Sequence, residues 1–250
     1  MTSADGEDAE DVEVTRLAVP YTRPSPVEIH RPRDADGSVV FALHGQGMTP
    51  RKFARVVRPA VPPRTTLVLP RAPLPFEVRR QTENGVRYRE GASWYVYLGD
   101  TPEFLVEMQR AEAWLAAVHD AGPAKDPTLD PVRTALLGFS QGGYLAGYVG
   151  LRDPERWRRL VVCGARIKHE VLEDEARAVG GENPHFRVLA VHGADDASVP
   201  PGPARTSAER VAAWGVPAEF RTYPGGHEVL GDAACRAAVR AFLGEPYCAS

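Results

Sequence analysis

The sequence lacks a membrane-spanning run, an excess of charge of one sign and a signal peptide, and is in these respects that of an ordinary globular protein. No apolar run approaches the roughly 18 to 20 residues that a membrane-spanning helix needs. Charge of one sign is also missing, because 30 basic residues face 33 acidic ones, which gives a formal net charge of -3. Nothing therefore predicts binding to nucleic acid or another polyanion. The amino-terminal stretch MTSADGEDAEDVEV has neither the positive charge nor the apolar core of a signal peptide. A cytoplasmic protein without stable membrane insertion is the expectation.

Cysteine is scarce, and the common nucleotide-binding motifs are missing. The three cysteines, Cys163, Cys235 and Cys248, cannot all pair with one another and do not have metal-ligand spacing, so we expect free thiols. Neither G-x-x-x-x-G-K-[ST] nor a well-placed G-x-G-x-x-G is present. The sequence implies no metal and no organic cofactor.

The 250 residues are 43% hydrophobic and 25% charged, as expected of one soluble α/β domain. Residues 1–14 are predicted to form a flexible acidic tail, because like charges and few apolar groups cannot offset the entropy cost of ordering. Its acidic residues precede the first basic one, Arg16: Asp5, Glu7, Asp8, Glu10, Asp11 and Glu13. Residues 15–250 are predicted to form a single domain.

Short apolar and β-branched runs alternate with helical patterns after the tail. The predicted strands occupy 39–45, 66–70, 134–140, 158–164, 187–193 and 219–225. Helical spacing or glycine stops mark helices within 104–118, 204–215 and 232–244. Residues 16–32 allow one or two antiparallel edge strands. This alternation predicts an α/β fold with a mostly parallel sheet covered by helices on both faces.

One strand runs directly into a turn that carries a lone hydroxyl. In GFSQG, Gly138 and Gly142 flank Ser140 with the G-x-S-x-G spacing of a strand-to-helix turn that raises a nucleophile above the sheet. A serine nucleophile also needs a base and a site for the developing oxyanion. The alternative is a tight turn whose serine only caps the following helix.

Suitable partners follow later strands. Asp195 and Asp196 come directly after one strand and His227 after the last, so that the chain order Ser, Asp, His is the one used on such sheets. The residues alone do not choose between the two aspartates. His44 and His192, within LHG and VHG, are interpreted as histidines that brace turns.

Two backbone amides are predicted to form the oxyanion hole. That of Gln141 follows the nucleophile and opens a helix, where the helix dipole favours negative charge. That of Gln46 lies in the loop LHGQGMT, where Gly45 and Gly47 allow a sharp turn.

With these residues in hand, the chain resembles the phospholipase/carboxylesterase family of α/β-hydrolases from about Val39 to Leu243. The resemblance rests on LHGQGMT, LPRAP, SWYVY, GFSQGGYLA, VHGADDASVP and GGHEV. It implies an α/β-hydrolase fold without a large cap domain, and it assigns the acid of the triad to Asp196, beside Ser140 and His227. It also implies that the oxyanion amides are those of Gln46 and Gln141, and that Trp94 lies near the acyl-binding groove.

The chain departs from the family at one loop and carries an arginine-rich segment. Gln46-Gly47-Met48 replaces the family's frequent Leu-Gly-Asp, which predicts a more polar groove beside Met48 and disfavours a long apolar acyl chain. Residues 76–95 contain Arg79, Arg80, Arg87 and Arg89. They are interpreted either as a solvated loop or as a lid or pocket wall that favours an anionic substrate.

These observations predict a serine hydrolase that cleaves small-molecule carboxylic esters through an acyl-enzyme. A thioesterase acting on acyl-proteins or acyl-carriers is the alternative, because the same machinery serves both reactions. A binding protein of this fold without turnover is the third hypothesis, which the filled triad positions disfavour. A homodimer is one assembly that the sequence allows.

Overall fold

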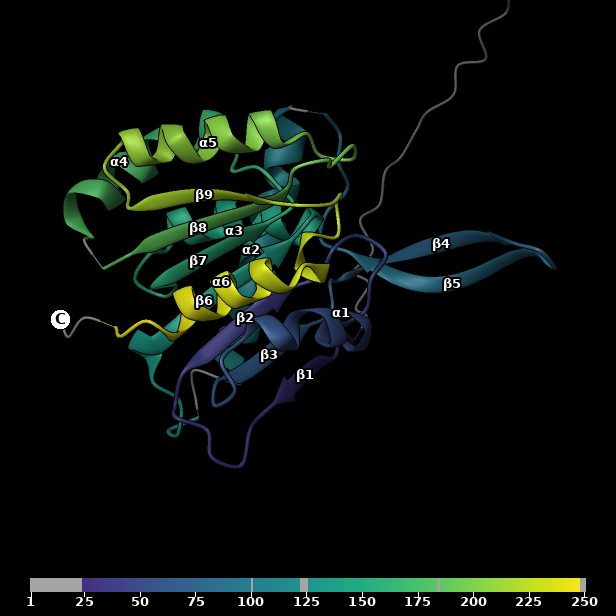
Figure 1. Ribbon diagram of the computed structural model, residues 1–250, viewed down its shortest axis with the longest axis horizontal. Helices are drawn as coiled ribbons and strands as arrows, with labels where there is room; N and C mark the ends of the chain where they lie inside the picture. The colour runs from purple at the N-terminus through teal and green to yellow at the C-terminus, as the bar shows by residue number, and fades with distance from the viewer. Residues whose placement is uncertain (1–23, 100, 122–125, 184, 248–250) are drawn as a thin grey trace, which may run out of the picture.

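The computed structural model describes residues 24–99, 101–121, 126–183 and 185–247, so the predicted acidic tail and Cys248 lie outside the described residues. The described part contains a seven-stranded sheet of order β1-β3-β2-β6-β7-β8-β9 (Figure 1). The strands are β1 (Val27–His30), β2 (Val39–Leu43), β3 (Thr66–Pro70), β6 (Thr134–Phe139), β7 (Arg159–Cys163), β8 (Arg187–Gly193) and β9 (Ala218–Tyr223). β1 pairs antiparallel with β3, and the other neighbouring pairs are parallel. This arrangement confirms the predicted mostly parallel sheet.

Helices cover both faces of the sheet. They are α1 (Pro50–Val57), α2 (Pro102–Ala121), α3 (Gln141–Arg152), α4 (Glu173–Glu182), α5 (Pro201–Ala213) and α6 (Ala233–Gly244). Short 3-10 turns lie at η1 (Arg58–Ala60), η3 (Pro131–Arg133), η4 (His169–Val171) and η5 (Val229–Gly231). Buried residues of α2, α3, α4 and α5 belong to one apolar cluster, and those of α1 and α6 belong to a second. The sheet separates the two clusters.

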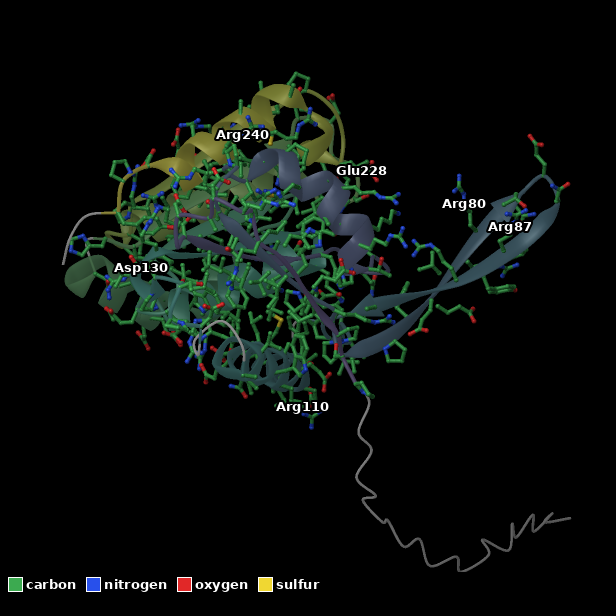
Figure 2. All side chains as sticks on the ribbon, turned by 90° about the horizontal axis from the view of Figure 1, so that it is seen from below. Arg80, Arg87, Arg110, Asp130, Glu228 and Arg240 are labelled. Carbon is green, nitrogen blue, oxygen red and sulfur yellow. The ribbon has the colours of Figure 1, made fainter. Side chains whose placement is uncertain are left out.

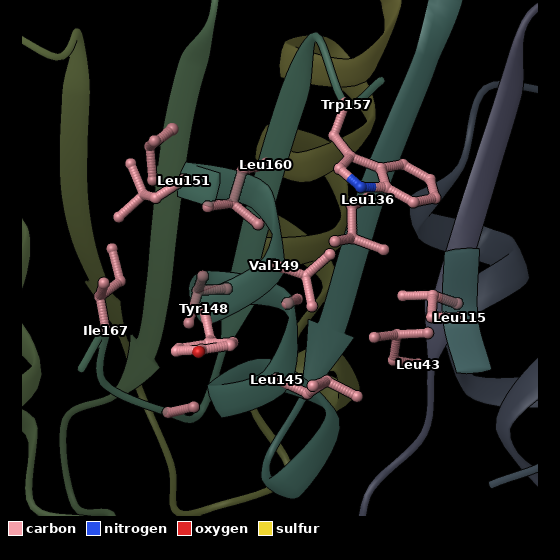
Figure 3. Packing of buried hydrophobic residues seen from close by; sticks show 14 of the residues in the cluster. Leu43, Leu115, Leu136, Leu145, Tyr148, Val149, Leu151, Trp157, Leu160 and Ile167 are labelled. Carbon is pink, nitrogen blue, oxygen red and sulfur yellow. The ribbon is translucent and has the colours of Figure 1, made fainter. Parts of the chain in front are cut away.

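The inner strands β2, β3, β6, β7 and β8 are largely apolar because each of them contributes buried side chains to both clusters. Alternate side chains of a strand point to opposite faces, so Phe41 and Leu43 of β2 join the first cluster while Val40 and Ala42 join the second. Figure 3 shows Leu43 beside Leu115 of α2 within the first cluster. Two-sided burial holds the carboxyl ends of the parallel strands in one row.

The predicted strands and helices are all present, but a hairpin after β3 was not foreseen, and neither were the helices α1 and α4. β4 (Leu74–Thr82) and β5 (Gly85–Ser93) form an antiparallel hairpin that projects from the body of the protein (Figures 1 and 2). Most of the hairpin is at least partly exposed, and burial begins only at Gly91 near its base. Apolar Leu74, Phe76 and Val78 alternate with exposed residues at the start of β4, but the alternation ends at Arg79, and residues 87–90 of β5 are all exposed. The pattern is therefore too short to distinguish the hairpin from a loop in the sequence.

Membrane-spanning helices and cysteines, both discussed from the sequence, can be examined in the described ranges. No helix there is long and apolar enough to cross a membrane. Cys163 and Cys235 are free and buried, and burial raises the pKa of both thiols. Neither thiol is therefore a reactive thiolate at neutral pH.

Candidate active site

Ser140 occupies a strained turn between β6 and α3. Its φ of 54° and ψ of -123° make it the one non-glycine residue with positive φ in the described part of the chain. The Ser140 N–H donates to the carbonyl of Cys163 at 2.9 Å, and its own carbonyl accepts from Gly143 at 2.7 Å and Tyr144 at 3.0 Å. These bonds hold a backbone conformation that costs about 1–3 kcal/mol for a residue with a side chain.

The flanking glycines provide clearance for the helix that follows. A Cβ on Gly138 would lie 2.1 Å from the carbonyl oxygen of Gly142, and one on Gly142 would lie 2.3 Å from that of Leu43. Neither glycine has positive φ. Their smallness lets α3 begin directly against β6 and β2, whereas the strained dihedral angles belong to Ser140 itself.

The strain at Ser140 leads to a stability prediction. The free energy of unfolding should be higher for Ser140→Gly than for Ser140→Ala, by about 1 kcal/mol or more. Glycine adopts positive φ without steric cost, whereas alanine does not. Urea denaturation of the two inactive variants followed by circular dichroism measures the difference. Equal midpoints would show that the turn carries no strain.

The structure places Ser140, Asp196 and His227 in one hydrogen-bonded row at the carboxyl edge of the sheet. The Ser140 Oγ lies 2.8 Å from His227 Nε2, and His227 Nδ1 lies 2.8 Å from Asp196 Oδ2. Ser140 follows β6, Asp196 follows β8 and His227 follows β9. In this arrangement, the His227 imidazole can take the proton of the serine hydroxyl, and the Asp196 carboxylate can stabilise the resulting imidazolium.

The two neighbouring aspartates have different environments. Asp195 is exposed, whereas Asp196 is 4% exposed and its Oδ1 accepts the backbone N–H groups of Ser198 and Val199, each at 2.9 Å. Burial raises the pKa of the Asp196 carboxyl, but the hydrogen bonds from Val199 and His227 outweigh it and bring the pKa below its ordinary value. Asp196 is therefore ionised at neutral pH.

His192 is a further residue in contact with the acid. It is fully buried, and its Nε2 lies 2.7 Å from the carbonyl oxygen of Val199 and 3.2 Å from Asp196 Oδ2. A carbonyl oxygen only accepts, so Nε2 carries the proton. The sequence interpretation of a turn-bracing histidine foresaw the contact with the loop but not the contact with the carboxylate.

Gln46 and Gln141 both line the pocket that contains Ser140. Within the described part of the chain, neither backbone N–H has a hydrogen-bond acceptor. The Gln141 side chain is instead engaged, since its Oε1 accepts from the Trp94 N–H at 2.9 Å and its Nε2 donates to the Tyr95 carbonyl at 3.0 Å. Neither amide is therefore engaged by another described residue.

The base of the hairpin holds the loop that carries Gln46. Gly47, at φ 71°, donates its N–H to the Ala92 carbonyl at 2.8 Å, and its carbonyl accepts from the Arg89 guanidinium at 2.9 Å. A Cβ on Gly91 would lie 2.4 Å from the Gly47 oxygen. The hairpin therefore fixes the geometry of this loop from outside.

His44 braces the same loop from inside. Its Nδ1 donates to the Gly45 carbonyl at 2.8 Å, and its Nε2 accepts the Ala72 N–H at 3.2 Å. Both bonds require the neutral ring with the proton on Nδ1. Burial lowers the pKa of His44 to about 4, which keeps the ring neutral at ordinary pH.

The buried His44 predicts a loss of stability in mild acid. Its pKa of about 4 in the folded protein lies below the ordinary value of 6.5, so the unfolded chain binds more protons between these pH values. The free energy of unfolding should fall by about 3 kcal/mol from this group as pH drops from 6.5 to 4. Urea denaturation at several pH values should show this contribution in the wild type and not in His44→Gln. Parallel profiles for the two proteins would contradict it.

Two residues expected near the substrate are absent from the lining of the described pocket. Trp94 is 1% exposed and is not among the residues that line the pocket, and its indole N–H donates to the His44 carbonyl at 2.7 Å. Met48 is partly buried against the cluster beneath α1 and α6, and it also lies outside the pocket lining. Trp94 thus supports the loop of Gln46, whereas Met48 belongs to that loop.

The pocket beside Ser140 has a volume of about 420 Å³. Its lining includes four aromatic residues, Tyr95, Tyr97, Phe104 and Tyr144, and two cationic residues, Arg166 and Lys168. The hairpin arginines are not part of this lining, and Figure 2 shows Arg80 and Arg87 toward the outer part of the hairpin. Their interpretation as a pocket wall is therefore wrong.

A mostly parallel sheet with helices on both faces and a serine in a strained turn after a central strand define an α/β-hydrolase. A family model described as Phospholipase/Carboxylesterase matches residues 25–238, and the chain belongs to this family of hydrolases. This match confirms the resemblance recognised in the sequence.

Solved structures of related proteins agree with the family. The chain is similar to esterase PE8, with 26% identity, a TM-score of 0.63, and coverage of 88% of this chain and 97% of that one. A carboxylesterase from Mesorhizobium loti has 22% identity and a TM-score of 0.70, with 89% and 95% covered. Zea mays acyl-protein thioesterase 2 has 18% identity and a TM-score of 0.66, with 88% and 100% covered.

Proposed function

We propose that the protein is a serine esterase that hydrolyses small-molecule carboxylic esters through an acyl-enzyme intermediate. The observation that carries the proposal is His227, which lies within hydrogen-bond distance of both the Ser140 hydroxyl and the Asp196 carboxylate. A helix cap would not need a buried acid and a bridging imidazole. The fold family supports hydrolysis, and the row of three residues supports the serine route.

In the acylation step, Ser140 Oγ attacks the ester carbonyl carbon while His227 Nε2 takes the hydroxyl proton. Asp196 keeps the remaining proton on His227 Nδ1 and stabilises the imidazolium. The carbonyl oxygen becomes an oxyanion that the amides of Gln46 and Gln141 receive. His227 then gives its proton to the departing alcohol oxygen, and Ser140 keeps the acyl group.

In the deacylation step, water replaces the alcohol. His227 takes a proton from water as the water oxygen attacks the acyl carbon, and the same two amides receive the second oxyanion. When the bond to Ser140 Oγ breaks, the serine oxygen regains its proton from His227 and the carboxylic acid leaves. Losing one oxyanion donor typically costs roughly 10²- to 10³-fold in kcat.

A thioesterase is the second candidate, because similar folds include an acyl-protein thioesterase and the chemistry of attack is unchanged. Kinetics with phenyl butyrate and S-phenyl thiobutyrate separate the two functions. Each kcat/KM is divided by the rate constant for hydrolysis of the same compound by hydroxide, which corrects for its intrinsic reactivity. We expect the corrected kcat/KM to be higher for the oxygen ester. A corrected preference of about tenfold or more for the thioester would support the thioesterase, and turnover of neither would contradict both.

A further inference from the structure

His192 lies near the end of β8, four residues before Asp196, and its side chain is fully buried. Its Nε2 donates to the Val199 carbonyl at 2.7 Å and lies 3.2 Å from Asp196 Oδ2. The other ring nitrogen, Nδ1, is buried and has no hydrogen-bond partner among the described residues. A buried acceptor without a partner lowers stability, so an apolar side chain would suit this place better if only packing mattered. The one group that an apolar residue could not supply here is the Nε2–H.

Four N–H groups of the described residues approach the Asp196 carboxylate. Its Oδ1 accepts the backbone amides of Ser198 and Val199, and its Oδ2 lies 2.8 Å from His227 Nδ1. The His192 N–H is the fourth, and it approaches the same oxygen as His227. Because both amides belong to one loop and hold one oxygen, the direction of the other oxygen depends on the groups on its own side. His192 is the fully buried group on that side, whereas His227 is the group to be oriented.

Val199 connects His192 to the other oxygen of the carboxylate. The Val199 carbonyl accepts from His192 Nε2, and the Val199 N–H donates to Asp196 Oδ1 at 2.9 Å. The imidazole of His192 therefore holds the loop that binds Oδ1 and at the same time lies against Oδ2. An N–H in this position restrains the plane of the carboxylate and places partial positive charge beside the oxygen that faces His227.

We propose that His192 is a positioning residue of the esterase, which acts through Asp196 by holding its carboxylate in the direction that His227 needs. The inference rests on the proposed function and adds to it a residue that does not line the pocket of Ser140. Its effect should therefore fall on kcat and not on substrate binding. Among the described residues, Asp196 is the charged partner of His227, and His192 faces that carboxylate from β8.

Two substitutions of similar length separate the N–H from the space that the side chain fills. In His192→Gln an amide N–H can take the place of the Nε2–H, whereas His192→Met offers no donor. We expect kcat for 4-nitrophenyl butyrate to fall by about tenfold or more in His192→Met, as for the loss of a hydrogen bond to a charged group, and by less than about threefold in His192→Gln. KM should change by less than about twofold in both. His30→Met, which removes an exposed histidine of β1, should keep the wild-type kcat.

The pH dependence shows whether the effect passes through the acid. The acidic limb of kcat/KM reports the proton on the base of the free enzyme. In His192→Met this limb should move to higher pH by about half a unit, because the less compensated Asp196 carboxylate stabilises the imidazolium of His227 more strongly. His192→Gln should keep the wild-type limb. ¹⁵N NMR of histidine-labelled protein should show the same shift in the titration of His227 with no substrate present.

A folded His192→Met with the wild-type kcat and an unmoved limb would overturn the proposal. Equal losses in His192→Gln and His192→Met, with both limbs unmoved, would show that the residue only packs and would overturn it as well. If circular dichroism shows that His192→Met does not fold, His192→Phe keeps a planar ring without a donor at Nε2. In the wild type, ¹⁵N spectra should show the proton of His192 on Nε2, and a proton on Nδ1 instead would overturn the proposal without any variant.

The proposed function fails in a different way. A wild-type protein that hydrolyses no ester and does not react with a fluorophosphonate would overturn the esterase. The NMR titration of His227 in the wild type and in His192→Met needs no turnover, so it would still decide whether His192 acts on the base through Asp196.

Discussion

Ser140→Ala is expected to abolish ester hydrolysis, with a fall in kcat of about 10⁶-fold, the size seen when a triad nucleophile is removed. The Ser140 Oγ lies 2.8 Å from His227 Nε2, which places this hydroxyl to give its proton to the proposed base as it attacks. The same change should abolish labelling by a fluorophosphonate probe. Hydrolysis of 4-nitrophenyl butyrate and mass spectrometry of the labelled protein measure the two effects.

A second serine of the pocket provides the control. Ser198 also lines the pocket, but it contacts the triad through its backbone N–H, which donates to Asp196. Ser198→Ala should therefore still be labelled once per chain. Circular dichroism should show that Ser140→Ala is folded, because the substitution removes a single hydroxyl. Labelling that persists in folded Ser140→Ala would reject Ser140 as the nucleophile.

Asp196→Asn is expected to lower kcat by about 10⁴-fold while leaving the fold intact. The amide can keep one acceptor oxygen for Ser198 and Val199, but its NH₂ group would then face His227 Nδ1. That contact favours the tautomer with the proton on Nε2, which cannot take the proton of Ser140. The neutral amide also fails to stabilise the imidazolium. Steady-state kinetics across pH should show the loss throughout the neutral range.

Asp195→Asn is the matched control, because it makes the same chemical change one residue earlier. Asp195 is exposed, and its backbone N–H donates to the Gly225 carbonyl at 2.9 Å, a contact that the substitution keeps. We expect kcat within a few-fold of the wild type. A large loss in Asp195→Asn with activity kept in Asp196→Asn would mean that the acid of the row has been assigned one residue too late.

Ser140 and His227 could be singled out as candidate nucleophile and base because the constraints on these residues are local in the sequence. A buried strand, a turn with small neighbours and a small-residue helix occur within a dozen residues around Ser140. Parallel strands align their carboxyl ends, so a residue directly after a strand, such as His227, is placed by topology alone. The choice of Asp196 over Asp195 needed the family resemblance, since the direction of two adjacent loop side chains depends on backbone angles that spacing does not specify.

The supporting residues depend on contacts between distant segments. His192 lies against the Asp196 carboxylate, Arg89 donates to the Gly47 carbonyl, and the indole of Trp94 donates to the His44 carbonyl. Arg89 and Trp94 lie more than 40 residues from their partners. No periodicity in the sequence predicts which carbonyl an arginine or an indole will meet.

The sequence by itself determined the class of fold and the order of the reactive residues, because apolar runs and glycine-bounded turns are readable along one dimension. Only the tertiary structure decided what surrounds them. It made the hairpin a support for the Gln46 loop and placed Lys168 in the pocket, because burial and charge at a point depend on every segment that packs there.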